Sequence, residues 1–157
     1  MRRENLFCFI KCINSRFEGK YIAGVKYERK RVMIHRLCAE GVSPVFEGIK
    51  ITLQEDVDTL YQRLGNTDYG FYHGTMKEAT KLLKQKLFYS PEIRKLFTKH
   101  QLEDIEQERE KITEKIWHHY EELSEQGYPI MQLVDERPHT LCKHTGGSYT
   151  WNPKHYK

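Results

Sequence analysis

The chain has 157 residues and a formal net charge of +4, with 38% hydrophobic and 31% charged residues. This length fits one domain with its own hydrophobic core. The composition excludes an intrinsically disordered chain, and no apolar run reaches the roughly 18 residues that a membrane-spanning helix needs. We therefore expect a single domain over residues 1–157, without a membrane segment.

The charge is unevenly distributed along the chain. Residues 1–36 contain ten Lys and Arg against three Asp and Glu, whereas residues 102–125 contain three against nine. A basic region of this density attracts phosphate groups, although it also serves solubility alone. The pattern favours a basic side and an acidic side on one protein.

The amino-terminal run Leu6-Phe7-Cys8-Phe9-Ile10 follows two arginines but is cut by Lys11, so it is too short for the apolar core of a signal peptide. Cys8, Cys12, Cys38 and Cys142 do not require a disulfide framework in a chain of this size. We expect reduced thiols and a cytoplasmic location.

Short stretches rich in β-branched and aromatic residues predict strands in the first half of the chain. Three successive strands are expected to form an antiparallel meander, with a basic turn at Arg29-Lys30 between the second and the third. A further edge strand is an option at Ile130–Val134. The expected strands are Leu6–Ile13, Lys20–Glu28, Arg31–Cys38, Val45–Ile51 and Tyr69–His73.

Helix signals dominate the second half. Capping-box patterns begin at Thr52 and Thr75, predicting one helix over 53–64 and another ending near Leu87. Ser90-Pro91-Glu92 predicts the start of a long helix that ends at Gly127. Thr98 and Gln101 also have the form of a capping box, so an optional break is placed near Thr98. The fold class expected is α+β: one antiparallel sheet of about five strands covered by two short helices and one long acidic helix, followed by a loop-like tail at 138–157.

Basic and aromatic residues are the broadest functional signal. Lys and Arg on a hairpin and along one helix face can follow a phosphate backbone, and tail aromatics between lysines can stack on bases. The alternative is a solvated surface and a tail packed on the protein body. The predicted nucleic-acid contacts are Arg29, Lys30, Arg31, Arg36, Lys77, Lys81, Lys84, Tyr149 and Trp151.

Thiol and imidazole side chains at both ends of the chain offer a zinc site. Thiolate and imidazole are the ligands that zinc prefers, and the candidates are Cys8, Cys12, His139, Cys142 and His144. Their spacing matches no known zinc module, and Cys8 and Cys12 also fit one buried strand face as small hydrophobes. His118 and Glu122, one turn apart on the expected helix, are a second candidate for a metal or acid–base pair, which an exposed polar helix face explains equally well.

Phe71-Tyr72-His73-Gly74-Thr75 resembles the His-Gly-Thr strand of ADP-ribosyltransferases. The resemblance implies that His73 is a catalytic-site residue that hydrogen-bonds the ribose of NAD, and that the Gly74 backbone holds the nicotinamide amide. Tyr89 is the matching aromatic for stacking on nicotinamide. Thr75 and Glu78 are equally explained as a capping box, with Gly74 in the turn before it.

We expect a small basic protein that binds nucleic acid, either DNA or RNA. A further option is that it also processes the bound strand. Whether the protein is an enzyme stays open, and neither NAD nor zinc is favoured as a cofactor. One alternative is an NAD-dependent transferase that uses His73. The other is a protein-binding inhibitor or adaptor, or a homodimer, that acts through the acidic helix at 102–125. Its contact would be a seam of apolar residues spaced three and four apart between Leu102 and Leu123.

Overall fold

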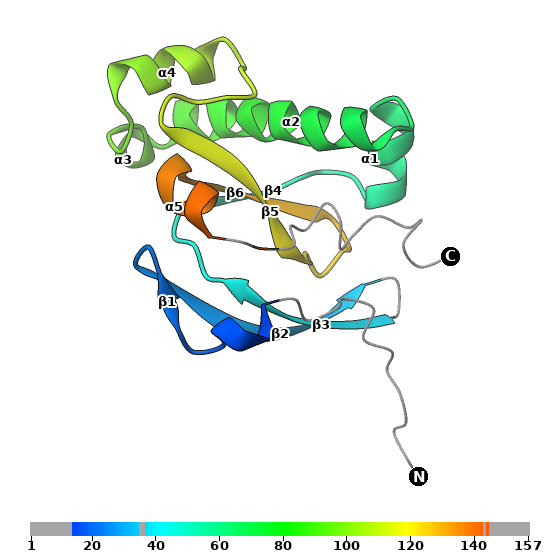
Figure 1. Ribbon diagram of the computed structural model, residues 1–157. Helices are drawn as coiled ribbons and strands as arrows, with labels where there is room; N and C mark the ends of the chain where they lie inside the picture. Colours follow the sequence, from blue (N-terminus) through cyan, green and yellow to red (C-terminus); the bar gives the residue numbers. More distant parts are fainter. Residues whose placement is uncertain (1–13, 35–36, 143, 145–157) are drawn as a thin grey trace.

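The computed structural model describes residues 14–34, 37–142 and 144 (Figure 1). Two three-stranded antiparallel sheets carry the architecture, in the orders β1-β2-β3 and β4-β6-β5. The strands are β1 Tyr21–Ile22, β2 Val25–Ile34, β3 Leu37–Pro44, β4 Ile49–Thr52, β5 Lys115–Leu123 and β6 Pro129–Asp135. The helices are α1 Val57–Arg63, α2 Asp68–Tyr89, α3 Pro91–Arg94, α4 Lys99–Glu106 and α5 Glu136–Leu141, after a 3-10 turn at Ser15–Phe17.

The α+β class is confirmed, but the single five-stranded sheet is not what forms. Strand β2 continues through Arg29, Lys30 and Arg31, because no turn-forming residue interrupts it, and Lys30 pairs with Gly41 of β3. The basic residues therefore lie along a strand and not at a hairpin tip. The first expected strand, Leu6–Ile13, lies outside the described residues.

The predicted strand at Tyr69–His73 is wrong, because this segment belongs to helix α2. Thr67 provides the N-cap of α2, accepting a hydrogen bond from the Gly70 amide, so the helix starts well before the expected cap at Thr75. Helix α1 is likewise capped by Asp56, which accepts from the Thr59 amide, and not by Thr52, which ends β4.

The predicted long acidic helix is also wrong. The capping box at Thr98 and Gln101 is confirmed, but helix α4 ends at Glu106. The chain then turns back, and the Asp104 carboxylate stabilises the turn by accepting hydrogen bonds from the Thr113 amide and hydroxyl, at 2.8 and 2.6 Å. Residues after Lys115 form β5, so the seam expected to support a homodimer or a protein partner does not exist as one helix face.

Helix α2 covers one face of the β4-β6-β5 sheet, and the β1-β2-β3 sheet lies on the other side (Figure 1). Alternating residues of β5 show the two faces. The Trp117 indole donates to Thr80 Oγ1 on α2 at 2.9 Å, and His119 is hydrogen-bonded to Thr75 Oγ1 at 2.8 Å. His118, between them, points to the opposite face. None of the helices in the described part of the chain is long and apolar enough to cross a membrane.

Strand β6 lies in the centre of its sheet and not at an edge, with β4 on one side and β5 on the other. Gly48 allows β4 to begin close against β6. A Cβ atom at Gly48, whose φ is +156°, would lie 1.8 Å from the Leu133 carbonyl oxygen. The central position of β6 brings Lys50 of β4 and His118 of β5 into register with the same residue, Gln132.

Candidate metal centre

Three imidazoles meet on the face of the β4-β6-β5 sheet that is turned away from α2. They come from His118 on β5, His139 on α5 and His144 just after α5, and one ring nitrogen of each lies within 4.8 Å of the others. The ring centroids of His139 and His144 are 4.6 Å apart, and His118 lies 5.0 Å from His144. Imidazole nitrogens at such separations can share one transition-metal ion.

The Phe46 ring packs against all three imidazoles, with centroid distances of 5.0 Å to His118, 5.4 Å to His139 and 5.5 Å to His144. Phe46 is itself buried, and its carbonyl oxygen accepts a hydrogen bond from Gln132 Nε2 at 2.8 Å. An apolar wall beside the imidazoles excludes water from one side of the cluster and keeps the rings in place.

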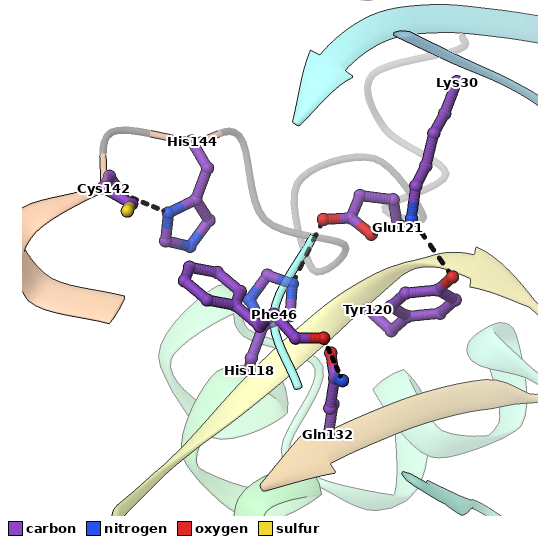
Figure 2. A network of polar contacts seen from close by, with 8 residues as sticks. All are labelled: Lys30, Phe46, His118, Tyr120, Glu121, Gln132, Cys142 and His144. Atoms are coloured by element: carbon purple, nitrogen blue, oxygen red, sulfur yellow. Dashed lines mark hydrogen bonds and ion pairs between the residues drawn. The ribbon is translucent and has the colours of Figure 1, made fainter. Parts of the chain in front are cut away.

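The hydrogen bonds of the cluster leave ring nitrogens available for a ligand. His118 Nε2 lies 3.1 Å from Glu121 Oε1, whereas its buried Nδ1 has no hydrogen-bond partner among the described residues (Figure 2). His144 Nδ1 donates to the Cys142 carbonyl oxygen at 2.6 Å, which leaves Nε2 as the lone-pair nitrogen. Buried polar atoms are nearly always paired, so the arrangement around His118 fits a metal ligand.

Burial also favours the neutral form of the His139 and His144 imidazoles, which is the state that coordination requires. Burial, followed by the nearby His144 and His118, lowers the pKa of His139 to about 3. Burial likewise lowers the pKa of His144 from its ordinary value.

A buried acidic group lies behind His118. The Glu121 carboxylate is bonded to His118 through Oε1, and its Oε2 lies 3.5 Å from Lys30 Nζ, which also donates to the Tyr120 hydroxyl at 3.1 Å (Figure 2). Burial would raise the pKa of Glu121, but the His118 hydrogen bond and the Lys30 charge outweigh burial and lower it. Burial would also lower the pKa of Lys30, but Glu121 and Tyr120 raise it.

A second lysine lies on the same face and is exposed. Lys50 of β4 and His118 of β5 both pair in register with Gln132 of β6, and directly paired residues point to one side of a sheet. Lys50 Nζ lies 4.0 Å from the centre of the Tyr120 ring. Among the described residues, no carboxylate lies within ion-pair distance of Lys50.

The structure brings together only part of the metal set predicted from the sequence. His139 and His144 lie in the cluster, and His118 completes it. Cys142 points elsewhere, with its buried thiol donating to the Ile22 carbonyl oxygen at 3.4 Å, and Cys8 and Cys12 lie outside the described residues. His118 was expected on a helix with Glu122. It lies on a strand and pairs with Glu121 instead.

The predicted nucleic-acid contacts are spread over both sides of the molecule. Arg29 forms an ion pair with Glu18 at 3.0 Å, and Lys30 is engaged by Glu121. Lys77 and Lys81 are exposed on α2, on the far side of the sheet from the imidazoles, and Lys84 donates to the Glu106 carbonyl oxygen. The structure does not describe the side chain of Arg31, or any part of Arg36, Tyr149 and Trp151.

Sequence reasoning placed His118 on a helix, as a candidate ligand beside Glu122 and apart from His139 and His144, and it missed Lys50 altogether. A signal for the strand was present. The run Ile116-Trp117-His118-His119-Tyr120 is rich in residues that favour strands, and the earlier residues 106–111 include no apolar side chain that would continue a helix face. The acidic charge and the three-and-four spacing of nearby apolar residues favoured a helix instead.

His73 lies within helix α2, where its Nδ1 forms an ion pair with Glu110, and its ring packs 4.3 Å from that of Tyr69. Gly74 is explained by helix packing, because a Cβ there would lie 2.8 Å from Leu64 Cδ2. The His-Gly-Thr segment is therefore a helical turn at the contact with Leu64, and not a strand that could present NAD-binding groups.

A family model described as the DNase/tRNase domain of colicin-like bacteriocin matches residues 38–146, well over half of the chain. Comparisons with curated proteins and with solved structures found no match. The family match corrects the resemblance to ADP-ribosyltransferases, because the matched family is one of nucleases. The matched residues include all three imidazoles of the cluster. The chain belongs to the family of DNase/tRNase domains of colicin-like bacteriocins.

Proposed function

We propose that this protein is a metal-dependent nuclease that hydrolyses DNA, and that His118, His139 and His144 hold its metal ion. One observation carries the proposal. Three buried or half-buried imidazoles converge within 4.8 Å, and the buried Nδ1 of His118 lacks a hydrogen-bond partner among the described residues. The nuclease family gives this cluster its chemical context.

A metal site favours DNA over tRNA as the substrate. RNA carries a 2′-hydroxyl group that can attack its own phosphodiester bond, whereas DNA lacks this group and needs an external nucleophile. A bound divalent cation supplies what DNA hydrolysis needs, because it polarises a phosphoryl oxygen and lowers the pKa of bound water. Three protein ligands are the set typical of catalytic zinc sites, which leave a position open for water or substrate.

The surrounding residues have separate roles in this proposal. Phe46 shields the imidazoles from water on one side, and the hydrogen bond from His144 to the Cys142 carbonyl fixes the orientation of its ring. Lys50 is an exposed cation on the same sheet face, and we assign it to a phosphate of the bound strand. Lys77 and Lys81 are exposed on α2, on the other side of the sheet, and we assign them no contact with the strand segment at the imidazoles.

The test compares substrates and metal dependence in one assay. Purified protein is incubated with supercoiled plasmid DNA or with tRNA, first after treatment with EDTA and then after readdition of Mg²⁺, Mn²⁺ or Zn²⁺. We expect DNA cleavage that EDTA stops and that at least one of these ions restores, with tRNA left intact. Cleavage that continues unchanged in EDTA would overturn the metal role, and faster cleavage of tRNA than of DNA would overturn the substrate.

A further inference from the structure

We propose that Glu121 is a positioning residue that orients His118 toward the metal, and that Lys30 of strand β2 holds Glu121 in place. The inference rests on the proposed function, since it concerns the same metal ion. It extends the site beyond the family match, because Lys30 precedes the first matched residue, position 38.

Both oxygens of the Glu121 carboxylate are engaged. Oε1 lies 3.1 Å from His118 Nε2, and Oε2 lies 3.5 Å from Lys30 Nζ. The side chain of Glu121 is only 7% exposed, and that of Lys30 is 16% exposed. A carboxylate this deeply buried needs partners for its charge, and these two contacts supply them.

The hydrogen bond determines which nitrogen of His118 faces the metal. A carboxylate only accepts hydrogen bonds, so His118 must carry its proton on Nε2 to donate to Glu121. The Nδ1 atom then keeps its lone pair, and Nδ1 is the buried atom without a partner among the described residues. Metal-bound histidines commonly use their second ring nitrogen in this way, which fixes both tautomer and ring orientation.

Strand β5 contains an irregularity that makes this contact feasible. Residues three apart on a regular strand point to opposite faces, so Glu121 would point away from His118. The pairing of β5 with β6 shifts register between His119 and Leu123, which returns Glu121 to the face of His118. Such bulges re-aim side chains and are frequent next to active sites.

Lys30 gives strand β2 a part in the metal site. Its ammonium group contacts the Glu121 carboxylate and donates to the Tyr120 hydroxyl, so it joins the β1-β2-β3 sheet to β5 (Figure 2). The loss of this cation would leave the buried Glu121 carboxylate without the cationic partner that it has among the described residues. Lys30 therefore supports the metal site as the partner of Glu121, and we assign it no phosphate contact.

The first measurement is Zn²⁺ affinity by isothermal titration calorimetry on the full chain. The variants are Glu121→Leu, Glu121→Gln and Lys30→Met, with Glu125→Gln and Lys26→Met as controls at exposed positions. Loss of a supporting contact typically weakens metal binding by about 10–100-fold, and we expect this for Glu121→Leu. Glu121→Gln keeps a hydrogen-bond acceptor and Lys30→Met keeps Glu121 itself, so both variants should lose less Zn²⁺ affinity than Glu121→Leu. The two control variants should bind Zn²⁺ as tightly as the parent.

The second measurement is the tautomer of His118 in the metal-free protein, by long-range ¹H–¹⁵N NMR. We expect the Nε2-protonated form in the parent and a mixture of tautomers in Glu121→Gln, which keeps the side-chain volume should Glu121→Leu not fold. Zn²⁺ affinity and tautomer both unchanged in the Glu121 variants would overturn this inference alone. A parent that binds none of Zn²⁺, Mg²⁺ and Mn²⁺ would overturn the proposed function and this inference with it.

Discussion

Lys50 Nζ lies 4.0 Å from the centre of the Tyr120 ring, so an exposed cation is held over an aromatic face beside the imidazole cluster. The contact restricts a long side chain without neutralising it, because a ring attracts a cation through its quadrupole and carries no charge. Lys50 therefore keeps its charge available on the sheet face where His118 points.

We predict that Lys50→Ala weakens DNA binding. If Lys50 contacts one phosphate, the slope of log affinity against log salt concentration should fall by about 0.9 for duplex DNA. Fluorescence anisotropy of labelled DNA across a salt series measures both quantities. Lys86→Ala is the matched control, because Lys86 is exposed on α2 across the sheet. Equal salt slopes for the Lys50 variant and the parent would show that Lys50 contacts no phosphate.

We predict that His139→Ala and His144→Ala each weaken Zn²⁺ binding by more than the roughly 10–100-fold expected for loss of a supporting contact. Each substitution removes one of the three imidazoles that we propose as metal ligands. Zn²⁺ should raise the melting temperature of the parent, because a ligand that binds the folded state stabilises it, and should do so far less in the variants. The control is His100→Ala, whose side chain is 82% exposed. A full Zn²⁺-induced shift in both variants would place the metal elsewhere.

Asp104 should make stability depend on pH in the acidic range. The Thr113 hydroxyl, the Thr113 amide and the Arg109 guanidinium together hold the pKa of the Asp104 carboxyl below its ordinary value, against the effect of burial. A lowered folded-state pKa contributes stability that is present above the unfolded pKa of about 3.9, and this stability is lost as the pH falls through the folded-state pKa.

The test is urea unfolding of Asp104→Asn and the parent between pH 7 and pH 3. Hydrogen bonds to a charged group are worth about 1.5–3 kcal/mol, so the variant should lose stability of this order at pH 7. The difference between the two proteins should shrink as the pH falls below about 4. If the difference in unfolding free energy between Asp104→Asn and the parent stays constant from pH 7 to pH 3, the ionised Asp104 carboxylate is not its source.

We predict that Gly48→Ala destabilises the protein more than Gly19→Ala does. Both glycines have positive φ, but a Cβ at Gly19 meets nothing within 4 Å, whereas one at Gly48 would lie 1.8 Å from the Leu133 carbonyl oxygen. Backbone strain alone costs about 1–2 kcal/mol, and a steric clash in a packed region adds about 1–3 kcal/mol. Thermal unfolding, followed by circular dichroism, measures the loss of stability in each variant. Equal losses of stability in Gly48→Ala and Gly19→Ala would show that β4 can shift away from β6.

The sequence predicted local features where side chains act on their own neighbours. The capping box at Thr98 and Gln101 forms as expected, because both of its hydrogen bonds close within one turn. The segment at Ile130–Val134 forms a strand, since its composition favours one. The imidazoles of His139 and His144 were recognised as metal candidates because their chemistry is independent of fold.

The sequence failed where distant residues decide between local options. Tyr69–His73 has strand-like composition, yet Phe71 packs from α2 into the core, with 1% of its surface exposed, and the Thr67 cap starts the helix before this segment. Apolar spacing over 102–123 favoured a helix, but the Asp104 contacts with Thr113 end it and redirect the chain. The cluster needs His118 from β5 beside His139 from α5, and only the tertiary fold brings these together.

The measurement that tests the central claim most directly is plasmid cleavage by His118→Ala beside the parent, with DNA affinity measured on the same samples and folding checked by circular dichroism. His118 belongs to the imidazole cluster and, being 1% exposed, offers no surface for DNA. We predict that the variant binds DNA as tightly as the parent but has lost cleavage in every metal tested. A folded His118→Ala variant that cleaves DNA at the parent's rate would contradict the assignment of the imidazole cluster as the nuclease site.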